Sequence, residues 1–234
     1  MLLWREVSGD SFYRRAAGRL RSNDTVLDIG ANIGLTSILF ADVQPAIRVI
    51  AVEPAPAIFA CLARNLDAYL RHGHAVQTAV GASSGRLPFT YYPEATGNSG
   101  LYADRAADDA VTRTFLRNSG LADDEITLMI DGLHVGERMT VEVTTVSELL
   151  RVHGVAEVAL LKIDVERAEL DVLRGIADGD WPRIRSVVAE VHDEHRLTAF
   201  CDGLRERGFA LHINQEDAFR GTGLFEIHAE RGGG

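Results

Sequence analysis

The sequence predicts an α/β protein with a doubly wound, mostly parallel sheet and helices on both of its faces. Two apolar runs, Thr25 to Gly30 and Arg48 to Glu53, are typical of buried strands, and the helical pattern of Leu35 to Ala41 separates them. Strand, helix and strand in this order are the signature of a parallel sheet. The 234 residues, of which 46% are hydrophobic, suit a single domain over residues 1–234.

The same alternation continues toward the C-terminus. Ile58, Leu62 and Leu66 recur at four-residue spacing and predict a helix over about 57–70, which a strand over 75–80 follows. Further strands are expected over 86–92, 139–146, 158–164 and 184–191, and further helices over 167–176 and 196–207. Two last short strand patterns, 209–214 and 224–228, predict an antiparallel hairpin at one sheet edge.

Two segments fall outside this alternation. An amphipathic pattern predicts a lead-in helix over about 8–20. The turn-rich and acidic segment over about 93–137 is interpreted as an insertion, which is either a lid that contacts substrate or a solvated helical face.

Composition narrows the classes of partner. The chain carries 24 Lys+Arg against 34 Asp+Glu, a net charge of −10, which disfavours binding along a nucleic-acid backbone. Cys61 and Cys201 are too few and too far apart for a disulfide scaffold or a zinc cluster. The first ten residues lack a signal-peptide pattern, and no window approaches the roughly 18 to 20 apolar residues of a membrane span. We therefore expect a cytoplasmic protein with no nucleic-acid or membrane partner.

The strongest local motif is the glycine turn that follows the first strand. Asp28, Gly30, Asn32 and Gly34 form an acid-x-Gly-x-Asn-x-Gly pattern that opens a helix. A dinucleotide fingerprint would need glycines at the positions of Asn32 and Leu35, so a pyrophosphate cradle is poorly supported. The pattern instead resembles the first motif of class I S-adenosylmethionine-dependent methyltransferases, whose ligand has no phosphate.

The end of the second strand carries Glu53 and Pro54. A carboxylate there can accept hydrogen bonds from both hydroxyls of an adenosine-type ribose. Ala79 and Val80, at the end of the third strand, are expected to line an adenine slot. The structural alternatives are that Asp28 only caps the turn and that Glu53 is an exposed strand-end charge.

Charged residues at the ends of two later strands are the candidates for chemistry. Asp164 ends one strand, and Glu190 and His192 share one side of the next. Methyl transfer to a hydroxyl needs alignment and a base, and the ordinary pKa of histidine, about 6.5, suits a base. We expect His192 to be the base, and Glu190 or Asp164 to orient either His192 or the substrate. The alternatives are charges that only pair around a helix start, and a divalent ion on Asp164 and Glu190, although no metal is expected.

Taken in order, these motifs resemble the FkbM family of S-adenosylmethionine-dependent methyltransferases. The matching blocks are Val26 to Gly34, Ala51 to Pro54, Leu161 to Glu166 with Ala168 and Glu169, and Glu190 to His192. The resemblance implies a Rossmann-like, seven-stranded class I methyltransferase fold, S-adenosyl-L-methionine as cofactor and O-methylation of a secondary metabolite, a polyketide-type chain or a sugar.

The resemblance also implies where the substrate binds. Asn98 and Ser99 lie in a stretch similar to a family loop that faces the active site, and Glu166 and Arg167 end the third block. Arg167 stands where the family usually has glycine. It is expected either to reshape the acceptor pocket or to contribute a charge to an anionic substrate.

Four functions remain in competition at this stage. The first is O-methylation of a small-molecule hydroxyl, either free or bound to a carrier. The second is a nucleic-acid or protein methyltransferase, although the chain contains no Pro-Pro pair for the motif that grips an extruded base. The third is a non-catalytic or carrier-dependent S-adenosylmethionine-binding domain related to those embedded in synthases. A dehydrogenase is disfavoured by the missing glycines. The acceptor and the oligomeric state are left open by the motifs.

Overall fold

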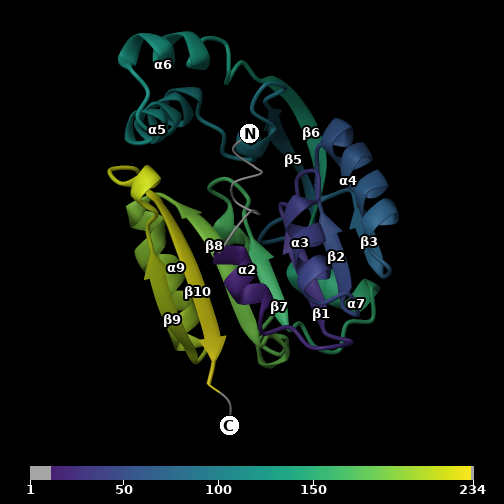
Figure 1. Ribbon diagram of the computed structural model, residues 1–234. Helices are drawn as coiled ribbons and strands as arrows, with labels where there is room; N and C mark the ends of the chain where they lie inside the picture. The colour runs from purple at the N-terminus through teal and green to yellow at the C-terminus, as the bar shows by residue number, and fades with distance from the viewer. Residues whose placement is uncertain (1–11, 233–234) are drawn as a thin grey trace.

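The computed structural model describes residues 12–232 and is organised around a seven-stranded sheet with helices on both faces (Figure 1). Its strand order is β3-β2-β1-β7-β8-β10-β9, in which only β10 runs antiparallel to its neighbours. The strands are β1 Thr25–Ile29, β2 Arg48–Val52, β3 Gly73–Val76, β7 Leu160–Ile163, β8 Ser186–His192, β9 Phe209–Asn214 and β10 Leu224–Arg231. The predicted fold class, with its antiparallel C-terminal hairpin, is confirmed.

Side-chain alternation along the strands divides the core into two layers. In β1, Val26 packs with α2, α3 and α4, whereas Leu27 and Ile29 pack with α7, α8 and α9 on the other face. These helices are α2 Phe12–Ala17, α3 Leu35–Val43, α4 Pro56–Tyr69, α7 Val146–Val152, α8 Glu169–Arg174 and α9 Glu194–Glu206. The predicted lead-in helix over about 8–20 corresponds to α2 in the described residues. Residues 1–11 lie outside the described range.

A second sheet departs from the expected arrangement. It has the order β4-β6-β5, with β4 Ala79–Val80, β5 Gly85–Tyr91 and β6 Glu137–Thr144. The predicted strand over 75–80 is therefore split, because Val76 pairs with β2 whereas Ala79 and Val80 pair with β6. The predicted 139–146 strand likewise belongs to this small sheet. An apolar run indicates that a strand is buried, but it does not indicate which neighbouring strand it pairs with.

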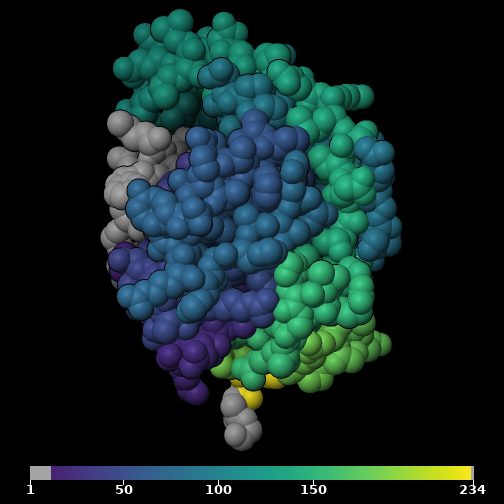
Figure 2. Space-filling model, turned by 90° about the vertical axis from the view of Figure 1, so that its right-hand side faces the viewer, coloured from purple at the N-terminus to yellow at the C-terminus, as the bar shows by residue number. Residues whose placement is uncertain are grey.

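The insertion lies beyond the carboxyl ends of the parallel strands. It contains η1 Thr96–Asn98, α5 Arg105–Asn118 and α6 Asp123–Ile130. Figure 1 shows α5 and α6 above the ends of β7 and β8, and in Figure 2 the same teal segment forms the upper end of the molecule. Ligands of open α/β sheets bind at this end, where β1 and β7 lie side by side and the chain reverses its direction of winding.

Candidate active site

A cavity of about 350 Å³ opens at the carboxyl ends of the central strands. Three parts of the chain line it, namely the strand-end turns, the insertion and the segment that leads into β10. Its size and its concave shape between a sheet and an insertion are usual for a small-molecule site. The predicted residues that line it are Gly30, Asn32, Glu53, Pro54, Ala79, Val80, Asn98, Ser99, Asp164, Glu166, Arg167, Glu190 and His192.

Two predicted residues, Asp28 and Gly34, do not line the cavity. They support the glycine turn that forms part of its wall. Gly34 precedes α3 with φ 88°, and a Cβ there would lie 2.8 Å from the Leu62 side chain. Gly30 has φ 75°, and a Cβ there would lie 1.7 Å from the carbonyl oxygen of Asp164. The glycine turn is therefore required by the close approach of the β7–α8 turn as well as by its own left-handed backbone.

A buried lysine lies beneath the glycine turn. Lys162 Nζ donates to the carbonyl oxygen of Gly30 at 2.7 Å and lies 3.2 Å from carboxylate oxygens of both Asp28 and Asp164. The second oxygen of Asp28 accepts from Ser37 Oγ at 2.6 Å. Burial lowers the pKa of Lys162, but the two carboxylates outweigh it and raise the pKa overall. Lys162 thus ties the ends of β1 and β7 together as a cation.

Lys162 was not among the site residues predicted from the sequence motifs. The available signal was a charged residue in the middle of the otherwise apolar strand Leu160–Ile163, because a buried charge requires partners. Those partners lie on β1, where Asp28 stands directly beside Lys162 in the register of the two strands.

Glu53 occupies a buried position at the end of β2. It is 5% exposed, and one of its oxygens accepts from the backbone N–H of Ala55 at 2.9 Å. Burial raises the pKa of Glu53 to about 7, against the lowering effect of the N–H groups of Ala55 and Asn32. The alternative of an exposed strand-end charge is therefore excluded. Asn32 itself has φ 48°, and its Oδ1 accepts from the N–H of Ile33 at 2.7 Å.

His192 lies between two carboxylates that differ from its expected partners. Its Nδ1 is 2.8 Å from Glu169 Oε1, and its Nε2 is 3.2 Å from Glu166 Oε2. Burial lowers the pKa of His192, but the carboxylates of Glu166 and Glu169 raise it more, so the imidazole is held protonated. Burial also raises the pKa of Glu166, although His192 opposes that rise.

Glu190 and Asp164 have other contacts. Glu190 accepts from the hydroxyl of Tyr13 at 2.6 Å, and Asp164 is paired with Lys162. The expected orienting role for His192 therefore falls to Glu166 and Glu169. In the described part of the chain, no three His, Cys, Asp or Glu side chains are grouped so as to hold a metal ion.

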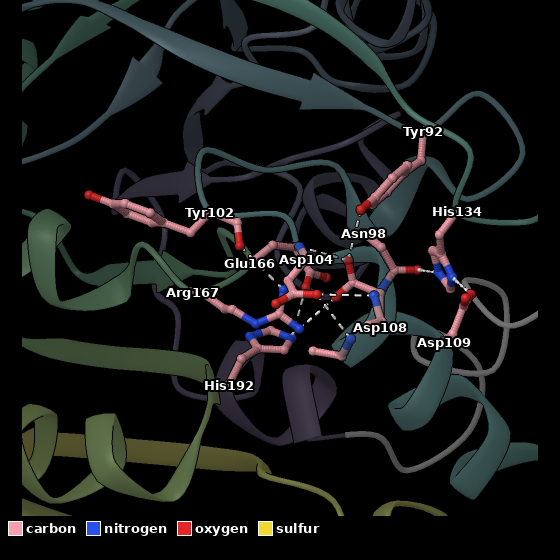
Figure 3. Close-up of polar contacts among 12 residues, drawn as sticks. Tyr92, Asn98, Tyr102, Asp104, Asp108, Asp109, His134, Glu166, Arg167 and His192 are labelled. Carbon is pink, nitrogen blue, oxygen red and sulfur yellow. Dashed lines mark hydrogen bonds and ion pairs between the residues drawn. The ribbon is translucent and has the colours of Figure 1, made fainter.

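The insertion contributes two polar clusters that the sequence analysis missed (Figure 3). Buried Asp108 accepts from Arg167 Nη2 at 2.5 Å and from the hydroxyl of Tyr92 at 3.0 Å. The second cluster is built on His134, whose Nδ1 lies 2.7 Å from Asp109 and whose Nε2 lies 3.3 Å from Asn98 Oδ1. Ser99, next to Asn98, accepts from the backbone N–H of Tyr92 at 3.0 Å through its hydroxyl.

Arg167 is restrained at every polar group. Its guanidinium pairs with Asp108, its N–H donates to Glu169 Oε1 at 2.9 Å, and its carbonyl oxygen accepts from Arg196. Both Glu166 and Arg167 have positive φ, 49° and 73°, which is strained for residues with a side chain. These contacts hold the turn in that conformation and keep Glu166 at the cavity wall.

Similarity to known proteins assigns the chain to a family. Residues 28–211 match the family pattern described as "Methyltransferase FkbM domain". The protein "31-O-demethyl-FK506 methyltransferase FkbM" of Streptomyces tacrolimicus is 40% identical over 99% of this chain and 90% of its own length. The chain belongs to the FkbM methyltransferase family. The predicted family is confirmed, and methyltransferase is the activity that the similarity supports.

Other relatives of this chain differ in size. "Methyltransferase sdnD" of Sordaria araneosa is 33% identical over 89% of this chain and 82% of its own length. "AMB antimetabolite synthetase AmbE" of Pseudomonas aeruginosa is 34% identical over 99% of this chain, which corresponds to 12% of that synthetase. The same kind of domain thus occurs both as most of a protein and as a small segment of a synthetase.

The fold of this FkbM-family chain is that of class I methyltransferases. The crystal structure of precorrin-6y C5,15-methyltransferase from Geobacter metallireducens superposes with a TM-score of 0.52 at 13% identity, over 97% of this chain and 92% of that one. At this identity the likeness concerns the fold alone. Within residues 12–232, no helix has the length and apolar character needed to cross a bilayer.

Proposed function

We propose that this protein is an S-adenosylmethionine-dependent O-methyltransferase that acts on a hydroxyl of a small molecule. One observation carries the proposal. The same cavity is lined by Glu53, a buried carboxylate suited to bind a ribose, and by the buried acid–base pair of Glu166 and His192. A binding module without chemistry has no need of the second group. The insertion over the cavity, together with the acidic charge, favours a small acceptor over a nucleic acid.

The residues at one end of the cavity fit the cofactor. Glu53 is a buried carboxylate that would accept hydrogen bonds from two ribose hydroxyls of the cofactor, and Gly30 and Asn32 line the same cavity. Ala79 and Val80 supply small apolar surface for an adenine ring. When bound, S-adenosylmethionine supplies a methyl group on a positively charged sulfur, which leaves as the thioether S-adenosylhomocysteine.

The acid–base pair of Glu166 and His192 supplies a group that can accept the proton lost by the acceptor hydroxyl. Glu166 lies at the cavity wall with one oxygen on His192, and both ring nitrogens of His192 face carboxylates. We assign the hydroxyl proton to the carboxylate of Glu166, whose pKa burial raises toward that of a useful base. His192, held by Glu169, fixes the direction of that carboxylate. Aligning the hydroxyl with the methyl group supplies much of the remaining rate.

Calorimetric titration with S-adenosylhomocysteine tests the proposal. We expect micromolar or tighter binding to the wild type, a loss of about 100-fold in Glu53→Ala, and no binding of NADH as the parallel control. Glu206→Ala is the matched variant, because Glu206 is an exposed carboxylate of α9 that does not line the cavity, and it should leave the affinity unchanged. A folded wild type that does not bind S-adenosylhomocysteine would refute the proposal.

A further inference from the structure

The half of the cavity away from Glu53 has an apolar roof built from distant segments. Phe115 of α5 and Phe219 of η3 Asp217–Phe219 stack with ring centroids 4.8 Å apart. Asn118, at the end of α5, donates from its amide to the carbonyl oxygens of Ala218 and Arg220 at 3.0 and 2.9 Å. These contacts hold the insertion against the loop that precedes β10. Val111, Phe115, Leu133, Phe219 and Leu224 give this half its apolar lining.

The cationic side chains in the lining are both neutralised. Among the described residues that line the cavity, Arg167 and His192 are the two that carry positive charge. His192 lies between Glu166 and Glu169, and Arg167 is paired at 2.5 Å with Asp108, which is 2% exposed. A buried ion pair of this kind is costly to separate, because separation leaves a charge without a partner in a poorly solvated place.

The rest of the charge in the lining is negative. Glu53, Glu94, Asp164 and Glu190 are carboxylates of the same cavity. An anionic group beside the reacting hydroxyl would lie near the carboxylate of Glu166 and would find the guanidinium of Arg167 already paired with Asp108. Like charges at short range in a site of low dielectric disfavour binding strongly.

We infer that the acceptor is an uncharged alcohol with an apolar body, and that Asp108 excludes anionic acceptors by occupying the guanidinium of Arg167. The alcohol places its hydroxyl toward Glu166 and its body against Phe115 and Phe219. This assigns to Asp108 a specificity-determining role, and it stands against the expectation that Arg167 contributes a charge to an anionic substrate. The inference rests on the proposed function, because that function makes this half of the cavity the acceptor half.

A pair of probes of the same shape tests the inference on the full chain saturated with S-adenosylhomocysteine. Cyclohexylmethanol and cyclohexanecarboxylate differ in one group, an alcohol against a carboxylate. We expect saturation-transfer NMR titrations to show the alcohol binding to the wild type at least about tenfold more tightly than the carboxylate. Asp108→Asn should free Arg167 and raise the affinity for the carboxylate by about tenfold or more, leaving the alcohol little changed.

The matched control is Asp123→Asn, in which the same exchange frees a different arginine. Asp123 pairs with Arg117 of α5 at 2.7 Å on the surface, and neither residue lines the cavity. This variant should leave both affinities unchanged. Should Asp108→Asn fail to fold, Asp108→Ser removes the same charge, keeps a polar side chain beside Arg167 and should give the same gain of affinity for the carboxylate probe.

The outcomes separate this inference from the proposed function. Equal binding of the two probes to the wild type, no binding of the alcohol, or no gain of carboxylate affinity in Asp108→Asn would each overturn the inference. The separate titration with S-adenosylhomocysteine decides the proposed function. If S-adenosylhomocysteine binds and the probes do not discriminate, only the inference fails.

Discussion

The two halves of the cavity are built in different ways. The half around Glu53 is formed by the backbone turn after β1 and by neighbouring parallel strands, so Asp28, Gly30 and Gly34 lie within seven residues of one another. The half proposed to receive the acceptor is assembled from segments far apart in the chain, such as Asp108 and Arg167, which are 59 residues apart. The first half depends on backbone geometry and strand register, whereas the second depends on ion pairs and packing between side chains.

The largest expected effect is at Gly30, where the backbone of two turns meets. Gly30→Ala would place a methyl group 1.7 Å from the carbonyl oxygen of Asp164 at a φ of 75°. We expect it to lower the free energy of unfolding by about 5 kcal/mol or more, or to prevent folding. Thermal and denaturant unfolding measure this change.

Gly132→Ala isolates the contribution of the close approach. Gly132 has the same φ, 75°, but a Cβ there would meet nothing within 4 Å. This variant in the insertion should cost only about 1 kcal/mol, the usual penalty for a left-handed residue with a side chain. Equal losses in the two variants would show that the turn around Gly30 is not specially constrained.

Sequence patterns predicted the sheet and the first half of the site for the same physical reason. Buried parallel strands leave apolar runs, and a backbone turn leaves glycines such as Gly30 and Gly34 at fixed spacing. Partners across the fold leave no such pattern. The pairing of Ala79 with β6, the position of Lys162 beneath the turn and the contact of His134 with Asn98 all required the structure.

The second expected effect tests the buried cation beneath the glycine turn. Lys162→Met keeps the apolar stem but leaves Asp28 and Asp164 without their shared partner. We expect a loss of about 3 kcal/mol in the free energy of unfolding, because a buried carboxylate is then uncompensated. Adding Asp28→Asn to Lys162→Met should recover part of that loss. A double variant less stable than the single one would contradict this account.

The third effect is the pH dependence of cofactor binding through Glu53. Burial raises its pKa to about 7 in the free protein. In the proposed function, ribose hydroxyls would donate to the ionised carboxylate. Protonation therefore competes with binding, so affinity for S-adenosylhomocysteine should weaken about tenfold from about pH 8 to pH 6. Stability runs the other way, because a raised carboxyl pKa makes folding less favourable as pH rises from about 4.5 through 7. Glu53→Gln should abolish the pH dependence of the affinity and reduce that of stability, and a pH-dependent affinity that persists in this variant would assign it to another group.

The smallest effect separates backbone from side chain at Arg167. Arg167→Gly and Arg167→Ala both release Asp108, but only glycine adopts the φ of 73° without strain. The glycine variant should therefore be more stable than the alanine variant by about 1 kcal/mol in denaturant unfolding. At Arg64, an exposed residue in the middle of α4, the order should reverse by a similar amount, because glycine is the poorer helix former. If Arg167→Ala and Arg167→Gly are equally stable, the turn has relaxed to another conformation after loss of the ion pair with Asp108. The conformation around Glu166 would then depend on the insertion, and the two halves of the cavity would be coupled through this ion pair.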